Sequence, residues 1–138
     1  MQLKFQSKSI NESFARSAVA AFVLDLDPTI SELADIKTAV SEAVTNSIVH
    51  GYRRSQGLIY ITVKITDTRK VIIKIRDKGQ GIADVKKAME PLFTTAQEEE
   101  RAGLGFAVMQ SFMDAVKVTS KIDKGTTVTL EKQIVALK

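Results

Sequence analysis

The spacing of apolar residues changes in the middle of the chain, and this change limits the possible folds. From Leu33 to Ile48, apolar residues recur every three or four positions, which predicts a long amphipathic helix ending at about His50, before Gly51. Between Ile59 and Arg76 they alternate with polar residues in two runs, which predicts two strands joined by a polar turn. A helix followed by paired strands favours a sheet with helices packed against it.

The first 50 residues contain three further signals. Residues 1–7 alternate loosely, as an edge strand can. Phe14, Ala18 and Phe22, together with Ala15 and Val19, give an apolar helical stripe that runs up to Leu24. Ser9–Glu12 and Thr29–Glu32 each match the capping-box pattern, so each predicts the start of a helix.

The C-terminal half predicts two more helices and a second hairpin. The expected segments are a short helix at 84–89, a mobile polar loop at 91–102, a helix at 104–114, and strands at 116–121 and 126–132. We therefore expect one α+β domain over residues 1–138. Its fold should be a two-layer α/β sandwich, with a mostly antiparallel mixed sheet and helices on one face.

Composition excludes several classes of protein. The chain has 138 residues and no cysteine, so it can form neither a disulfide framework nor a thiolate metal site. It begins without the apolar segment of a signal peptide and has no apolar run long enough to cross a bilayer. We expect a cytoplasmic protein without a membrane partner.

The net charge is +4, and the basic residues are spread along the sequence. Arg53–Arg54, Arg69–Lys70 and Lys86–Lys87 are isolated basic pairs, and no aromatic residues interleave with them. Because nucleic-acid binders usually show a clustered basic patch, we expect no direct nucleic-acid binding.

Glu42 and Asn46 are four residues apart in the long predicted helix, so they share one helical face. The Asn46 amide oxygen is a suitable ligand for Mg²⁺, and Glu42 could accept a proton from a hydroxyl group or water. Taken alone, such a pair is more often part of a solvated surface.

A second candidate group comes from glycine-rich loops. Asp77 ends an apolar strand and could accept a hydrogen bond from an adenine amino group, while Gly79 and Gly81 allow close approach of the backbone. Gly103-Leu104-Gly105 is expected to open a helix, whose exposed N–H groups favour phosphate. Each loop by itself also fits an ordinary turn or loop-to-helix junction.

Together these motifs resemble the GHKL (Bergerat-fold) ATPases, which include histidine kinases, gyrase, Hsp90 and MutL. The likeness continues through Glu90–Thr95 and Gly125–Thr127. Within this superfamily, the chain most resembles the anti-sigma F factors of sporulating bacilli, a family of serine kinases. This narrower resemblance covers nearly the whole chain. The segments that carry the narrower likeness are 11–16, 26–29, 41–51, 91–95 and 101–106.

The resemblance implies a role for each matching position. Glu42 is expected to be the general base and Asn46 the Mg²⁺ ligand. Asp77, with Gly81 and the Thr126 hydroxyl acting through water, is expected to recognise adenine, and Gly79 is expected to be a further ATP-binding residue. Arg16 matches a residue that contacts protein partners, and Arg101 one that senses the γ-phosphate. The residues expected around the phosphates are Thr95, Arg101, Gly103, Leu104 and Gly105.

The implied activity is ATP-dependent phosphorylation of a protein serine by a homodimer paired through its N-terminal strand and helix. With ATP or ADP bound, it would inhibit a sigma factor of the sigma F type, and it would phosphorylate the anti-anti-sigma antagonist. Two alternatives are a non-catalytic, nucleotide-dependent module that sequesters the sigma factor and a fragment of a gyrase-type or chaperone-type ATPase. Retention of Glu42 disfavours the first, and the lack of a transducer segment disfavours the second. The single histidine, His50, favours a structural or nucleotide-adjacent role over that of a phosphoacceptor.

Overall fold

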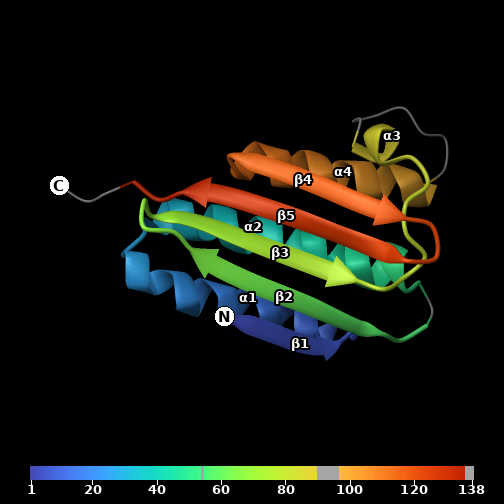
Figure 1. Ribbon diagram of the computed structural model, residues 1–138, viewed down its shortest axis with the longest axis horizontal. Helices are drawn as coiled ribbons and strands as arrows, with labels where there is room; N and C mark the ends of the chain where they lie inside the picture. Colours follow the sequence, from blue (N-terminus) through green and yellow to red (C-terminus); the bar gives the residue numbers. More distant parts are fainter. Residues whose placement is uncertain (54, 90–96, 136–138) are drawn as a thin grey trace.

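The computed structural model describes residues 1–53, 55–89 and 97–135, with only the backbone described for 97–103. The chain forms a five-stranded sheet with helices packed on one face (Figure 1). Its elements are, in order, β1 (Gln2–Gln6), α1 (Ile10–Val23), the 3₁₀ turn η1 (Leu24–Leu26), α2 (Ile30–Asn46), the π-helical turn η2 (Ser47–Gly51), β2 (Leu58–Ile65), β3 (Lys70–Asp77), α3 (Val85–Met89), α4 (Gln97–Phe112), β4 (Ala115–Lys121) and β5 (Gly125–Gln133).

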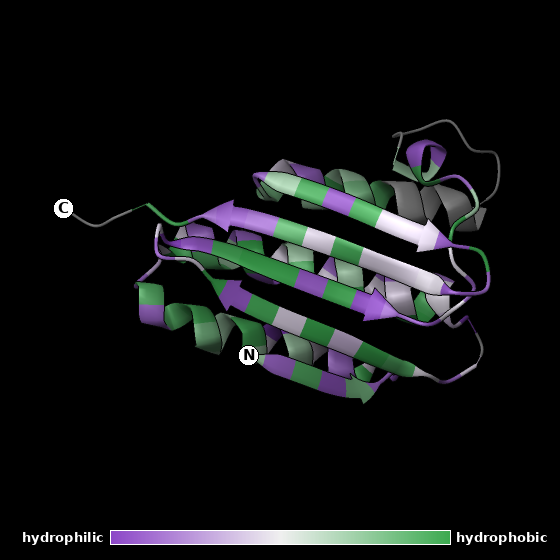
Figure 2. Ribbon diagram, viewed as in Figure 1, coloured by the Kyte–Doolittle hydropathy of each residue, from purple (hydrophilic) through white to green (hydrophobic). Residues whose placement is uncertain are grey.

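The sheet confirms the predicted α+β architecture. Its strand order is β1-β2-β3-β5-β4, and all four pairings are antiparallel. Hydrophobic and more hydrophilic residues alternate along most of β2, and β3 has a continuous hydrophobic stretch before it alternates, as Figure 2 shows. Ile61 and Ile75 lie opposite each other and are both buried, so the apolar face of the hairpin is the one that the helices cover.

Helix α2 crosses the middle of the covered face and contributes Ile36, Val40 and Val44 to the core. Its capping box is confirmed: Thr29 accepts a hydrogen bond from the Glu32 amide at 3.0 Å, and Glu32 accepts one from the Thr29 amide at 2.8 Å. The helical path continues to Gly51, near the expected end, but the last turn widens to a π turn.

The structure corrects two expectations for α1, the second only in part. Ser9 already has helical backbone angles and makes no side-chain cap, and the Glu12 carboxylate binds Ser41 and Arg16, so no capping box forms. The predicted apolar stripe is confirmed at Ala15 and Val19, which are buried, but was wrong at Phe14 and Phe22, which are 52% and 36% exposed. The residues that α1 buries are Ala15, Val19, Ala20 and Val23.

The prediction of a polar loop at 91–102 was also wrong for the second half of that segment. Residues 90–96 lie outside the described part of the chain, but residues 97–102 belong to α4. Gln97 and the three glutamates after it are good helix formers, and acidic residues stabilise a helix N-terminus. Within the described ranges, no helix is long and apolar enough to span a bilayer.

We predict that Thr29→Ala lowers the free energy of unfolding by about 1 kcal/mol, because it removes the side-chain acceptor of a formed capping box. Ser9→Ala is the matched control and should change stability by much less, since Ser9 caps nothing. Equilibrium urea unfolding of both variants measures the difference. Equal losses would contradict the assignment of the α2 cap.

Candidate nucleotide site

Asp77 stands at the base of a pocket, at the end of β3, and only 3% of its surface is exposed. Three donors hold its carboxylate: the Ser47 hydroxyl at 2.8 Å, the Gly79 amide at 3.0 Å and the Thr126 amide at 3.3 Å. Burial raises the pKa of Asp77 above its usual value, although the three hydrogen bonds act in the opposite direction.

The π turn η2 places the end of the α2 path against the Asp77 loop. Gln80 donates its backbone N–H to the Gly51 carbonyl at 2.9 Å and its side-chain amide to the His50 carbonyl at 2.7 Å. These bonds join the loop after β3 to the helix layer and place His50 beside the pocket. A π turn at such a position is a frequent feature of functional sites.

Gly79 and Gly81 occupy positions that no larger residue fits. A methyl group at Gly79 would lie 2.2 Å from the Gly51 carbonyl oxygen, and Gly81 has a φ of +76°. A methyl group at Gly81 would also lie 2.0 Å from the Lys121 carbonyl oxygen. Both glycines therefore allow the loop to pass closely between η2 and the β4–β5 turn.

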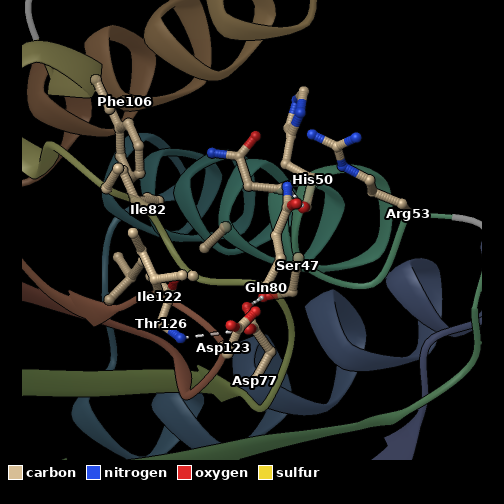
Figure 3. Close-up of a pocket in the computed structure, with 17 residues that line it drawn as sticks. Ser47, His50, Arg53, Asp77, Gln80, Ile82, Phe106, Ile122, Asp123 and Thr126 are labelled. Atoms are coloured by element: carbon tan, nitrogen blue, oxygen red, sulfur yellow. Dashed lines mark hydrogen bonds between the residues drawn. The ribbon is translucent and has the colours of Figure 1, made fainter.

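The pocket has a volume of about 390 Å³, within the range of small-molecule sites. Figure 3 shows Asp77 and Ser47 at one end of it and Phe106 and Ile82 at another. Its lining residues are Ala43, Asn46, Ser47, His50, Gly51, Arg53, Asp77, Gln80, Gly81, Ile82, Ala83, Ala88, Phe106, Ile122, Asp123, Thr126 and Val128.

Glu42 and Asn46 meet Gly105 where α2 packs against α4. A methyl group at Gly105 would lie 3.0 Å from Asn46 Nδ2 and 3.3 Å from Glu42 Oε2. Asn46 Nδ2 is buried and has no hydrogen-bond partner among the described residues. A buried amide without a partner is costly, so the side chain is suited to a polar ligand.

Glu42 is partly buried, and this burial raises the pKa of its carboxyl group above the usual value; the negative charge of Glu12 adds to the effect. A raised pKa makes a carboxylate a stronger base near neutral pH. Among the described residues, no group of three or more His, Cys, Asp or Glu side chains could hold a metal ion. A metal at this site would therefore depend on Asn46 together with ligand and water oxygens.

The structure agrees only in part with the predictions for the remaining site residues. Thr126 supports Asp77, but through its amide, since its hydroxyl lies 2.8 Å from Ser120 Oγ. Gly103–Gly105 do not open a helix: they lie inside α4, which begins at Gln97, and Leu104 is 50% exposed. Thr95 and the Arg101 side chain lie outside the described part of the structure.

Sequence reasoning missed Ser47 and Gln80, which fix the Asp77 carboxylate and the loop that follows it. Ser47 did carry a signal, because it is a polar residue at the end of an otherwise apolar helical stripe. Gln80 carried none, since its partner is a carbonyl group 30 positions earlier in the chain.

The amino-acid sequence is similar to those of known proteins. Residues 6–132 match the model of the histidine kinase-like ATPase domain. The anti-sigma F factor of Caldanaerobacter subterraneus subsp. tengcongensis is 61% identical over 134 residues, which cover 97% of this chain and 93% of that protein. The anti-sigma F factor of Geobacillus thermodenitrificans is 55% identical over 139 residues, covering 100% of this chain and 94% of that protein.

A solved structure agrees with the fold. The RsbU and RsbW domains of a Mycobacterium tuberculosis protein superpose with a TM-score of 0.70 at 20% identity. The match covers 97% of this chain and 32% of the other. At this identity the likeness concerns the fold alone.

We predict that Gly105→Ala weakens binding of a magnesium–ATP analogue several-fold and changes stability less, because two effects on stability oppose each other. Alanine is a better helix former by about 1 kcal/mol, but its methyl group would crowd Asn46 and Glu42. Calorimetric titration and urea unfolding measure the two effects separately. Gln110→Ala, at an exposed position of the same helix, is the control and should leave affinity unchanged. Unchanged affinity in Gly105→Ala would exclude the Asn46 face from the site.

Proposed function

The chain belongs to the histidine kinase-like ATPase family and, within it, to the anti-sigma F factors, and on this basis we propose that it is an ATP-dependent protein-serine kinase. It binds a sigma factor of the sigma F type and keeps it inactive. It also phosphorylates the anti-anti-sigma antagonist on serine. The observation that carries the proposal is the position of Glu42 one helical turn from Asn46, which lines the same pocket as Asp77.

Asp77 recognises the adenine ring. Its carboxylate is held in place by Ser47, Gly79 and Thr126, so it presents a fixed acceptor to the exocyclic amino group of adenine. Guanine carries a carbonyl oxygen at that position, and this oxygen would be repelled by the carboxylate because both groups are hydrogen-bond acceptors. This difference favours ATP and ADP over the guanine nucleotides.

Asn46 supplies an oxygen ligand for Mg²⁺. The residues fit this ion together with a phosphate: the Asn46 amide lines the pocket, so its Oδ1 would be the ligand, and its Nδ2, which has no partner among the described residues, would donate to a phosphate oxygen. When bound, Mg²⁺ neutralises phosphate charge during phosphoryl transfer. Thr95, Arg101, Gly103, Leu104 and Gly105 complete the surroundings of the phosphates, with Arg101 reading the γ-phosphate.

Glu42 is the general base. It accepts the proton of the substrate serine hydroxyl as the serine oxygen bonds to the γ-phosphorus, and the bond from that phosphorus to the leaving ADP oxygen breaks. Partial burial supports this role because it strengthens the carboxylate as a base. The packing of Gly105 against Glu42 and Asn46 supports it too, since it brings the base close to the ligand of the metal.

The surface of α1 contacts protein partners. Arg16 lies 3.4 Å from Glu12, and its guanidinium also donates to Ser13, so it is oriented while 37% of its side chain stays exposed. Exposed Phe14 and Ile10 lie on the same helix, and β1 pairs on one side only. These features support a homodimer paired through β1 and α1, with Arg16 available to the partners in the cytoplasm.

We predict that Glu42→Gln lowers phosphoryl transfer by about 10²–10⁴-fold and leaves nucleotide and sigma binding intact, because it removes the base and preserves the shape. Transfer from labelled ATP to the anti-anti-sigma protein measures the loss. In the wild type, the rate should rise with pH through a value above the ordinary range of glutamate, since protonated Glu42 is inactive and its pKa is raised.

Glu131→Gln, on the opposite face of the sheet, is the matched control and should transfer phosphate normally. Near-normal transfer by Glu42→Gln would show that Glu42 is not the base. Sigma binding without any transfer by the wild type would favour the non-catalytic sequestering module instead.

We predict that Asn46→Ala and Asp77→Asn both weaken ATP binding, but for different reasons. Asn46→Ala removes the metal ligand, so its defect should shrink when Mg²⁺ is omitted from both proteins. Asp77→Asn replaces an acceptor by a group that can also donate, so its preference for ATP over GTP should fall. Titrations with and without Mg²⁺, using both nucleotides, test this. Identical profiles for the two variants would contradict these roles.

A further inference from the structure

The sheet has one covered face and one uncovered face. Helices α1, α2 and α4 lie behind the sheet in the view of Figure 1, so the uncovered face is toward the reader. Because side chains alternate along a strand, the residues on this face are those that lie between the buried ones. The charged residues among them are Lys4, Lys64, Lys70, Lys74, Arg76, Lys117, Lys121 and Glu131.

This face, defined by those eight residues, is strongly basic. Its seven positive charges and one negative charge give +6, against +4 for the whole chain, so the rest of the chain carries −2. The sequence predicted basic residues without any cluster, and that expectation was wrong. Residues far apart in sequence are brought together because β1, β2, β3, β5 and β4 lie side by side.

The positive charges are mostly left without acidic partners. Glu131 lies 3.4 Å from Lys117 and 3.8 Å from Lys70. Lys4, Lys64, Lys74 and Lys121 are exposed and form no ion pair within the part of the chain that the structure describes. A surface of this kind attracts a polyanion and repels a second copy of itself.

An aromatic ring lies among the cations. Tyr60 is opposite Lys4 on one side and Arg76 on the other. The Arg76 guanidinium is 5.4 Å from the centre of its ring, and Lys78 Nζ is 5.3 Å from it. Aromatic rings and guanidinium planes on a sheet are the groups on which unpaired bases stack, beside cations that bind the phosphates.

We propose that the uncovered face of the sheet binds single-stranded nucleic acid. The lysines bind phosphates across the strands, and Tyr60 with Arg76 forms the place where a base stacks. A protein partner fits less well, because the central parts of protein–protein interfaces are poor in lysine, whereas nucleic-acid interfaces are strongly positive. The nucleotide pocket lies at the end of the sheet and on its helix side, so both ligands can bind together.

The test is fluorescence anisotropy of the full chain with a labelled single-stranded 20-mer, at several salt concentrations. Affinity should fall steeply with salt, with a logarithmic slope of about −3 if four phosphates are contacted. Lys74→Glu combined with Lys117→Glu should weaken binding at least about tenfold and reduce this slope. The control, Lys8→Glu with Lys37→Glu, changes the net charge equally at positions outside the sheet and should bind as wild type does.

Two further measurements complete the test. Tyr60→Leu should weaken binding of the single strand more than binding of a duplex, because only unpaired bases can stack on the ring. Binding of an ATP analogue and the thermal midpoint should be unchanged in Lys74→Gln combined with Lys117→Gln, whose oligonucleotide affinity should still fall.

The proposal is overturned if the wild type does not bind the 20-mer at 50 mM salt, or if both charge-reversal pairs lose affinity equally. A preference for duplex, or binding only to vesicles of anionic lipid, would overturn it as well.

Discussion

The buried carboxylate of Asp77 is the constraint on which the rest of the site depends. It accepts hydrogen bonds from η2, from the loop after β3 and from the start of β5. A buried charge is costly unless it is well bonded, so these three segments must hold their relative positions for the fold to be stable. The same carboxylate faces the pocket, and the bonds that stabilise it also fix the geometry with which it would meet a ligand.

A second constraint is the close packing of α2 against α4. Gly105 leaves room for Asn46 and Glu42 between the two helices, where any larger residue would crowd them. The space keeps Glu42 partly buried, which makes it more basic, and it leaves an Asn46 amide without a partner among the described residues. The burial of Glu42 and the unpartnered Asn46 amide therefore both follow from one close helix–helix contact.

The two faces of the sheet separate two kinds of chemistry. The covered face supplies the core and, at its end, Asp77 and Thr126 for the pocket. The uncovered face carries an excess of positive charge larger than that of the chain as a whole. Because alternate residues of one strand serve each face, β3 holds Asp77 in the site while it presents Lys74 and Arg76 to the solvent.

The sequence by itself determined the features that are local. The cap at Thr29, the length of the α2 path, the two hairpins and the placement of Asp77 at a strand end all follow from spacing and turn residues within a few positions. The motifs around Glu42, Asn46 and Asp77 indicated a nucleotide site only when they were taken together, through their resemblance to a known family.

Only the tertiary structure decided the features that depend on distant contacts. It turned Phe14 outward, because the small residues of α1 pack closest to the core, and it extended α4 back to Gln97. It gave Asp77 the donors Ser47 and Thr126, and it gathered scattered lysines on one face. The periodicity of apolar residues determines which residues share one face of a helix or strand. Which other segments that face contacts is determined only by the packing of segments that are distant in sequence.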